Sequence, residues 1–319
     1  LLSMWISNTA TAAMMLPLAL GLLSDEDGPG ERAFVLLGVA YSASIGGIGT
    51  LVGSPPNAIA AAQAGIGFAE WMRIGVPLVL LLLPLMAGVL FLMLRPQLGV
   101  QAAIPAEHAR SLPWTRAQRI TLVVFGLTAA GWIGAAPLGR ALGITADVDS
   151  AVALAAIVAL VASGAIGWPD IEQRTQWGVL LLFGGGLALS EVMATSGASR
   201  FMAGALTAAL QDAPTLLLLL VVVAFVVFLT ELVSNTASAA LLVPIFLGVA
   251  ASLGLPPPLF AVAIAVSASC AFMLPVATPP NAIVYATEQV PQATMMRCGL
   301  VLNGVCIVVI TAMAAWVLA

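Results

Sequence analysis

The stretch WISNTATAAMMLP, residues 5–17, places Ser-Asn-Thr inside apolar sequence, and LVSNTASAALLVP, residues 232–244, repeats it. Each copy is followed, at nearly equal distance, by a second polar motif; the two motifs of each half are called its polar marks. The motif Pro-Pro-Asn ends at Asn57 after the first copy and at Asn281 after the second. Two apolar halves that carry the same two marks in the same order predict an internal repeat.

Composition places this repeat in a membrane. The chain is 61% hydrophobic and 8% charged, with a mean hydropathy of +1.12, far from the values of a soluble domain. Apolar runs do not alternate in the manner of barrel strands, so we expect an all-α, multi-pass protein of the cell membrane. Runs of the length needed to cross roughly 30 Å of hydrocarbon lie at 33–52, 74–94, 117–137, 150–167, 178–195, 259–277 and 298–318.

Charge and cysteine content exclude other classes of protein. The net charge is −4 and no lysine occurs, so we expect no nucleic-acid partner. The loop at 95–119 carries four arginines, including Arg110, against one acid, which predicts a cytoplasmic loop. The three cysteines have no ligand or disulfide spacing and are expected to be packing residues.

The two halves are unequal in length. About 120 residues of the second repeat, from roughly Pro113, precede its Ser-Asn-Thr, whereas six residues precede the first. We therefore divide the chain into 1–112, the remainder of a first inverted repeat, and 113–319, the second. We also expect an amino-terminal portion of the first repeat to be missing from this sequence.

Both polar marks predict helices that break inside the membrane. Leu216–Leu229 and Ala237–Ala250 flank the second Ser-Asn-Thr, and fourteen helical residues reach only about 21 Å, so each arm is a half-span. Non-helical backbone at that depth must be buried in protein or line a wet cavity. The pattern leaves open whether the arms form a re-entrant hairpin or a straight broken helix.

The Pro-Pro-Asn marks break two further spans. Ser54 can act as a helix N-cap with Pro55 at the first helical position, where the missing N–H costs nothing. Thr278 and Pro279 repeat this arrangement. Four half-helices therefore begin at neutral Ser, Asn or Thr residues near the membrane midplane.

These helix ends indicate an ion site. Helix N-termini offer unpaired N–H donors and a positive dipole end, which suit an anion, while carbonyl ends suit a small cation. We expect each Ser-Asn-Thr to cap a half-helix, to donate to a carboxylate or similar oxyanion, and to help coordinate a cation. Because neither motif pair contains arginine or lysine, dipoles and co-bound cations must balance the charge of the anion.

The motifs SNTATAAMMLP, GTLVGSPPNAI, TELVSNTASAALLVPI and MLPVATPPNAI resemble the paired signatures of the divalent anion:sodium symporter family. The stretch WGVLLLFGGGLALSEVMATSG also resembles that family's helix before its second hairpin, so the likeness covers the whole chain. The resemblance implies carriers of dicarboxylates, citrate or sulfate. It also implies two inverted repeats with hairpins opening to opposite sides, a scaffold and a moving transport domain, homodimers and elevator-type alternating access.

The resemblance also implies the site residues. Those around the substrate are Asn8, Thr9, Ser54, Asn235, Thr236, Thr278 and Pro279. Those around one sodium ion are Ser3, Ser7, Asn8 and the Gly53 carbonyl. Those around a second sodium ion are Thr230, Asn235 and the carbonyls of Val233 and Ala277. Sodium is a co-substrate in this interpretation, and no cofactor is expected.

Several alternatives stay open at this point. We expect C4-dicarboxylate transport, of succinate or malate, by sodium symport, but sodium-independent anion exchange and transport of citrate or sulfate fit the same motifs. A passive anion channel would use polar breaks too, but it has no need of duplicated cation sites. Glu231 is an intramembrane acid that is either functional or a paired structural residue of the hairpin.

An enzyme is the least favoured class. An intramembrane enzyme needs a nucleophile with a base, or a metal cluster. The single histidine, His108, lies in the basic loop, and the acids are scattered along the chain. We therefore predict a carrier and not an enzyme.

Overall fold

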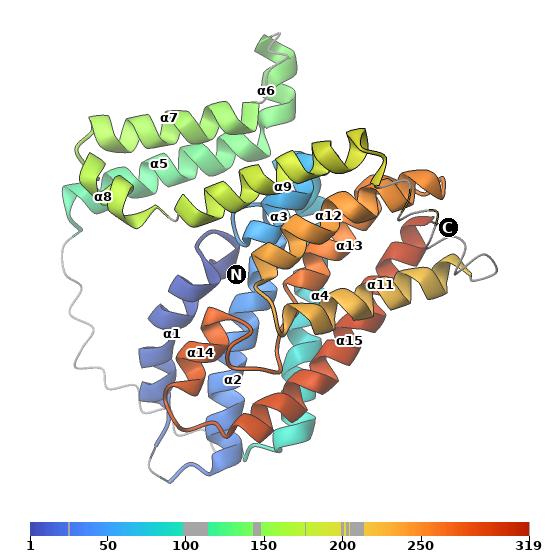
Figure 1. Cartoon of the computed structure of the whole chain (residues 1–319). Coiled ribbons are helices and arrows are strands. Elements are labelled where there is room, and N and C mark those ends of the chain that lie inside the picture. Colours follow the sequence, from blue (N-terminus) through green and yellow to red (C-terminus); the bar gives the residue numbers. More distant parts are fainter. Residues whose placement is uncertain are drawn as a thin grey trace. The chain divides into compact units, whose positions relative to one another are not determined.

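The computed structural model describes residues 1–319 except for 25, 98–113, 143–147, 176, 199–200, 202–203, 205–213 and 319. The described residues form helices joined by turns and contain no β-strand, which confirms the predicted all-α class (Figure 1). The central part of the predicted basic loop, with Arg110 and His108, and the predicted repeat boundary at 112/113 lie outside the described residues.

Contacts divide the chain into two compact units. Unit 1 comprises Leu1–Ile66, Ile74–Ile104 and Val179–Ala319, and unit 2 comprises Gly67–Arg73 and Pro105–Gly178. Both Ser-Asn-Thr motifs and both Pro-Pro-Asn motifs belong to unit 1, so every predicted site residue lies there.

The amino-terminal part of unit 1 contains the first broken helix. Its elements are η1 (Leu2–Met4), α1 (Asn8–Leu22), α2 (Pro29–Gly46), η2 (Gly47–Gly49), α3 (Pro55–Ala64) and α4 (Phe68–Leu94), of which the first turns of α4 belong to unit 2. Residues 47–54, between α2 and α3, are called the first break. The apolar run at 33–52 is therefore not one continuous α-helix.

The carboxyl-terminal part of unit 1 contains the second broken helix. Its elements are α9 (Trp177–Thr195), α11 (Thr215–Thr230), α12 (Asn235–Ser252), α13 (Pro257–Ala268), α14 (Pro279–Tyr285) and α15 (Gln292–Leu318). Residues 269–278, between α13 and α14, are called the second break. The apolar run at 259–277 thus contains only the twelve residues of α13 as helix.

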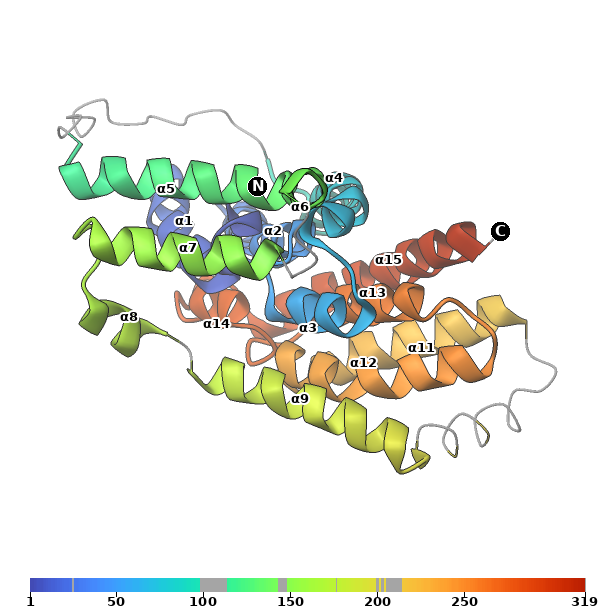
Figure 2. The ribbon, with the colours of Figure 1, turned by 90° about the horizontal axis from the view of Figure 1, so that it is seen from above.

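The second Ser-Asn-Thr joins α11 to α12 through a tight turn at 231–234. The two arms leave this turn in the same general direction, so they form a hairpin and not a straight broken helix (Figures 1 and 2). One expectation is wrong, because α12 has 18 residues and exceeds the predicted half-span of fourteen. The helix is longer by two residues at each end, because it begins at Asn235 within the motif and continues to Ser252.

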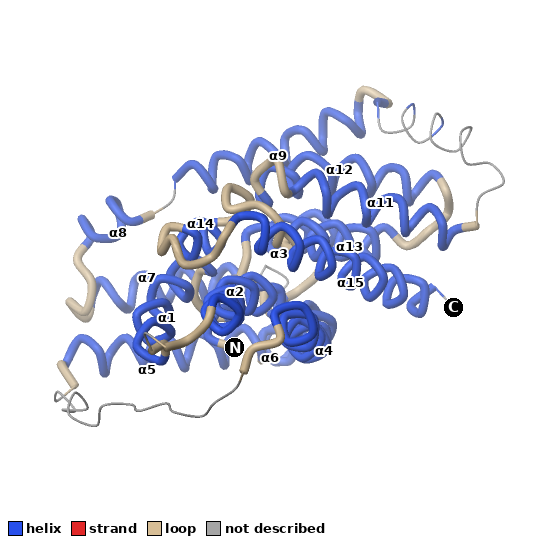
Figure 3. Tube along the Cα trace, turned by 90° about the horizontal axis from the view of Figure 1, so that it is seen from below, coloured by secondary structure: helices blue, strands red, loops and turns tan. Residues whose placement is uncertain are grey.

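The helices that follow the two breaks pack across the repeat. Helix α3, from the first half, packs against α12 and α13 of the second, and α14 packs against α1 and α2 of the first (Figures 1 and 3). In each half, the helix after the break therefore packs against helices of the other half. This interlocking holds the four predicted half-helix starts within one unit.

Helix α11 shows why the chain needs a membrane. Leu219, Val223 and Val227 recur every four residues and are buried in unit 1, whereas Val221 and Phe228 on other faces are about half exposed. A helix that is apolar all round, with one face exposed, suits hydrocarbon and not water. Within the described residues four helices are long and apolar enough to cross a membrane: Pro29–Gly49, Phe68–Leu94, Asn235–Ser252 and Gln292–Leu318.

Unit 2 contains α5 (Arg116–Ile133), α6 (Ala135–Leu142), α7 (Val148–Ala162) and α8 (Trp168–Arg174). Helices α5 and α7 pack together, and the Trp132 indole donates a 3.0 Å hydrogen bond to the Asp149 carbonyl. The Phe68 ring stacks on Trp132 with the centroids 4.9 Å apart. No predicted site residue lies in this unit.

Candidate functional site

A first polar cluster forms at the start of α1. The Ser3 hydroxyl lies 2.6 Å from both the Asn8 side-chain amide and the Ala43 carbonyl oxygen. The same edge of the amide lies 3.0 Å from the Ala43 oxygen and 3.2 Å from the Gly53 carbonyl oxygen. That edge can present Nδ2, which donates to these oxygens, or Oδ1, which leaves only oxygens facing one another. Hard cations take such oxygen ligands, so the cluster is suited to a small cation.

A second cluster has the same construction at the start of α12. The Thr230 hydroxyl lies 2.7 Å from Asn235 Oδ1 and 2.9 Å from the Ala268 carbonyl oxygen. In both clusters the hydroxyl precedes the asparagine by five residues, and the carbonyl follows 40 or 38 residues after the hydroxyl. The sequence repeat therefore extends to the hydrogen bonds, and these two carbonyls are ligand candidates that sequence reasoning missed.

Capping differs between the two halves. The Ser7 hydroxyl caps α1 by accepting from Ala10 N at 3.2 Å, and Thr278 caps α14 by accepting from Asn281 N at 3.3 Å. Ser234 and Ser54 occupy the equivalent N-cap positions without a side-chain cap bond. The expectation that both Ser-Asn-Thr motifs cap a half-helix through a side chain is therefore correct for one of them, and the first helical residue is the asparagine.

The Ser54 hydroxyl faces the other half instead. It lies 3.5 Å from the Ser269 hydroxyl, at the start of the second break, and both residues are buried. A predicted substrate residue of the first half thus adjoins the second break, which follows from the packing of α3 against α13.

The asparagines of the two Pro-Pro-Asn motifs hold the breaks together. Asn57 Nδ2 donates to the carbonyls of Gly47, Ile48 and Thr50 at 2.9, 3.3 and 2.8 Å. Asn281 Nδ2 donates to the carbonyls of the second break at positions 271 and 274, at 3.1 and 3.0 Å. Both side chains are fully buried. They replace the helical hydrogen bonds that the breaks lack, which buried backbone requires.

Replacing Asn281 by alanine is expected to lower the stability of the protein by about 2–3 kcal/mol, because two buried carbonyls would lose their donor. Thermal unfolding of the purified protein in detergent measures this change. Ser252→Ala, which removes one exposed hydroxyl at the end of α12, is the control and should unfold near the wild-type temperature. An Asn281→Ala protein as stable as this control would contradict the role of Asn281.

Each break is in close contact with a glycine of the long helix that comes later in the same half, α4 in the first half and α15 in the second. A Cβ atom built on Gly75 of α4 would lie 2.7 Å from the Ile48 carbonyl oxygen and 2.9 Å from the Gly49 oxygen. One built on Gly299 of α15 would overlap the Phe272 carbonyl group. Both glycines follow the motif asparagine by 18 residues, a spacing present in the sequence that comparison of the two halves could have found.

Glu231 serves the second break as a hydrogen-bond acceptor. Its buried carboxylate accepts the backbone N–H groups of Phe272, Met273 and Leu274 at 2.7, 2.9 and 3.0 Å, and the Asn303 side-chain amide at 2.8 Å. Of the two possibilities left open from the sequence, these bonds support the paired structural residue. Asn303 is a lone amide inside an apolar helix, and that isolation was the available signal for it.

The structure brings some of the residues predicted around sodium together. Three of the residues expected around the first sodium ion meet in the first cluster, but Ser7 caps α1 instead. Thr230 and Asn235 meet in the second cluster. Val233 lies in the turn at 231–234 and Ala277 in the second break, and the role of their carbonyls as ligands stays a prediction.

The residues expected around the substrate occupy the four helix starts. Their positions are Asn8 and Thr9 on α1, Ser54 before α3, Asn235 and Thr236 on α12, and Thr278 and Pro279 at α14. Helix α1 packs against α14, and α12 packs against α3, so each of these helices contacts one from the opposite half. The arrangement offers N–H and O–H donors to an oxyanion, with carbonyl oxygens close by for cations.

Comparison with known proteins agrees with this chemistry. Residues 62–318 match the family described as the transmembrane region of sodium:sulfate symporters. The chain belongs to the sodium:sulfate symporter family. The resemblance to divalent anion:sodium symporters drawn from the motifs is thereby confirmed. Members of the sodium:sulfate symporter family are transporters, so the chain is a multi-pass membrane transporter and not an enzyme.

Three relatives extend the match over the whole site. An uncharacterized transporter of Haemophilus influenzae is 48% identical over 98% of this chain and 69% of its own length. An uncharacterized transporter of Methanocaldococcus jannaschii is 42% identical over 97% of this chain and 70% of its own. The sodium-dependent dicarboxylate transporter SdcS of Staphylococcus saprophyticus is 34% identical over 97% of this chain and 65% of its own. The name of that relative states that its transport of dicarboxylates depends on sodium.

Proposed function

We propose that the protein is a sodium-coupled carrier of a divalent organic anion, with C4-dicarboxylates such as succinate or malate as its substrates. The observation that carries this proposal is the pair of oxygen clusters, Ser3 with Asn8 and Thr230 with Asn235, each at the start of a helix. A channel would not need two such clusters. The name of the Staphylococcus saprophyticus relative, a sodium-dependent dicarboxylate transporter, supports the choice of a dicarboxylate.

Electrostatics explains why the anion needs the cations. A dianion that leaves water loses several kcal/mol of solvation per charge. Neutral donors and helix ends, each equivalent to about half a positive charge at most, do not cover that loss. Sodium ions held by Asn8 and Asn235, which also face the anion in this proposal, supply the remaining positive charge.

The proposal includes the mode of transport. Two inverted repeats, divided at 112/113, would form a homodimeric elevator-type carrier of the plasma membrane, as the family resemblance implies. The recurrence of the same hydrogen bonds in both halves supports a repeat. The presence of all predicted site residues in unit 1 supports one moving transport domain.

Uptake into proteoliposomes tests the coupling. We expect labelled succinate uptake to require an inward sodium gradient, to cease when sodium is replaced by a large inert cation, and to accelerate under an inside-negative potential. Because coupling free energies are reciprocal, the dissociation constant of succinate should fall steeply as sodium rises. A sodium-independent dissociation constant with obligatory counterflow would contradict symport and establish exchange instead.

The same assay decides the substrate. Unlabelled malate, citrate and sulfate compete with labelled succinate in parallel reactions at saturating sodium. We expect malate to compete about as well as succinate. Stronger competition by citrate or by sulfate would replace the dicarboxylate in this proposal, and flux that never saturates would indicate a channel.

A further inference from the structure

The two breaks are not held in the same way, although their sequences correspond. In the second half Glu231 follows Thr230, and in the first half Met4 takes the equivalent place after Ser3. A Cβ atom built on Gly49 would overlap the Met4 side chain. An apolar group therefore packs against the first break at this position. At this position the second half has a carboxylate and the first half has an apolar side chain.

The Glu231 carboxylate is a buried anion without an arginine partner. It is 3% exposed, and none of the hydrogen bonds that the described arginines make involves it. Three successive backbone N–H groups, of residues 272–274, and the Asn303 amide satisfy it instead. Hydrogen bonds to a charged acceptor are stronger than neutral ones, so this set fixes the backbone of the second break.

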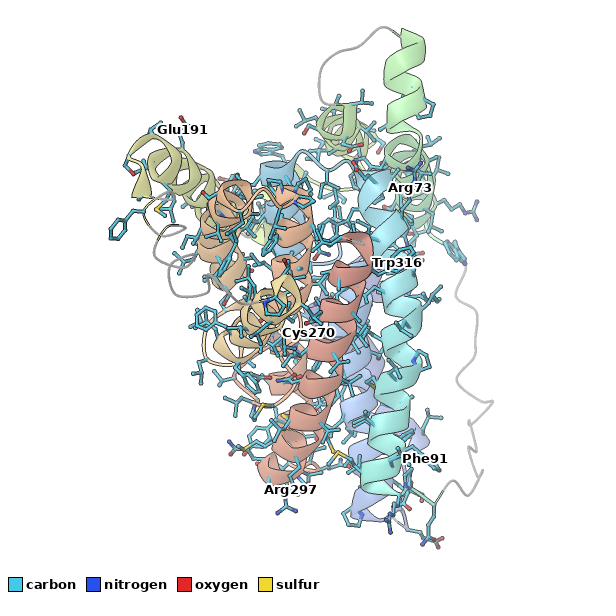
Figure 4. All side chains as sticks on the ribbon, turned by 90° about the vertical axis from the view of Figure 1, so that its right-hand side faces the viewer. Arg73, Phe91, Glu191, Cys270, Arg297 and Trp316 are labelled. Carbon is cyan, nitrogen blue, oxygen red and sulfur yellow. The ribbon has the colours of Figure 1, made fainter. Side chains whose placement is uncertain are left out.

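Two further contacts, from α2 and α15, hold the backbone of the second break. The Tyr41 hydroxyl of α2 donates to the carbonyl oxygen of Phe272 at 2.8 Å, and Gly299 lets α15 touch the same peptide. Figure 4 shows α15 between Arg297 near its start and Trp316 near its end, with Cys270 of the second break beside it. Residues 272–274 are thus held by Glu231, α2 and α15 together.

Placement of this backbone matters for the neighbouring cluster. Glu231 is adjacent in sequence to Thr230, whose hydroxyl joins Asn235 to the carbonyl of Ala268, directly before the second break. The break then continues to the cap of α14 at Thr278. Its conformation decides where the carbonyls near the second cluster point.

We propose that Glu231, with Asn303 as its partner, is a positioning residue for the second cation site. Its bonds fix the carbonyl groups of the second break, and its negative charge makes the second cation site the tighter of the two. This inference rests on the proposed sodium coupling. Because Met4 is neutral, the first cation site lacks this charge.

Glu231→Gln keeps the size of the side chain but removes the charge and one acceptor. We expect the sodium concentration for half-maximal uptake to rise about tenfold or more, as loss of one charge-assisted bond implies. The KM for succinate at saturating sodium should change by less than about threefold, because sodium binding restores the site through coupling. Glu191→Gln, at an exposed acid on α9, is the matched control. A wild-type sodium curve for Glu231→Gln would overturn the inference, since a structural residue alone would change only the amount of folded protein.

The partner residue gives a second test. Asn303→Asp places two carboxylates in one buried site, so uptake should fall strongly, and adding Glu231→Gln should restore part of it by removing one charge. An equal loss in the single and the double variant would contradict the pairing.

Hydrogen exchange separates this inference from the proposed function. In Glu231→Gln the amides of residues 272–274 should exchange about tenfold faster or more, while those of 46–52 should exchange at the wild-type rate. Unchanged exchange at 272–274 would overturn the inference even in a protein that transports normally. Sodium-independent uptake by the wild type would instead defeat the proposed function and leave the exchange result as the measure of the positioning role.

Discussion

Asn235→Ala and Asn8→Ala are each expected to abolish sodium-dependent uptake while the protein still folds. Each asparagine presents one amide to a hydroxyl and carbonyl cluster, and in the proposed mechanism it also donates to the anion. Loss of one charge-assisted bond costs about 1.5–3 kcal/mol, and both ligands lose one, so the combined affinity should fall by about 100-fold or more. Sodium-dependent uptake and succinate binding measure this loss.

Folding of these variants should be nearly normal. Both asparagines are first helical residues, where alanine is tolerated, and the N-cap positions belong to Ser7 and Ser234. Ser252→Ala, at the far end of α12, serves as the control for uptake as well as for unfolding. If either asparagine variant binds succinate as tightly as the wild type, that motif is not part of the site.

Gly299→Ala is expected to lower the stability of the protein. The added methyl group would overlap the carbonyl group of Phe272 and lie 2.6 Å from the Cα of Met273, and backbone held by Glu231 and Tyr41 cannot easily move away. Overpacking of this kind costs about 1–3 kcal/mol or more, so the unfolding temperature should fall clearly. Thermal unfolding in detergent and hydrogen exchange at the second break measure the effect.

Gly304→Ala on the same helix is the matched control. A Cβ at that glycine meets no atom within 4 Å, so the substitution should be neutral or slightly stabilising, as alanine favours a helix. Gly75→Ala and Gly88→Ala form the corresponding pair on α4. If Gly299→Ala and Gly304→Ala unfold at the same temperature, close approach of α15 to the second break does not matter for stability.

Much of the site could be predicted because its parts are close in sequence. Ser3 with Asn8, and Thr230 with Asn235, span one turn at a helix start, and a short segment of chain fixes such neighbours. The family motifs also directed attention to Gly53, whose carbonyl does face Asn8. The Pro-Pro-Asn motifs showed that the breaks exist, although the asparagines themselves were not assigned a role.

The rest depends on segments that are far apart in the chain. The carbonyl of Ala43 joins Ser3 across 40 residues, and Tyr41 reaches Phe272 across 231. Every residue has a carbonyl, so nothing in the sequence distinguishes the ones that face a cation. The sequence also could not decide whether the side chains of Ser234 and Ser54 cap their helices. A serine hydroxyl that lies beside another segment can contact that segment instead of the helix, as Ser54 contacts Ser269.

The sequence by itself determined a helical membrane protein with duplicated polar motifs, because composition and local spacing do not depend on tertiary contacts, and the resemblance of those motifs to a known family implied a transporter. Only the tertiary structure decided that α11 and α12 form a hairpin and that α3 and α14 cross into the opposite half. It alone decided that Glu231 accepts from the second break. The physical reason is that buried N–H and C=O groups must find partners wherever packing brings them, and that choice is made between segments and not within them.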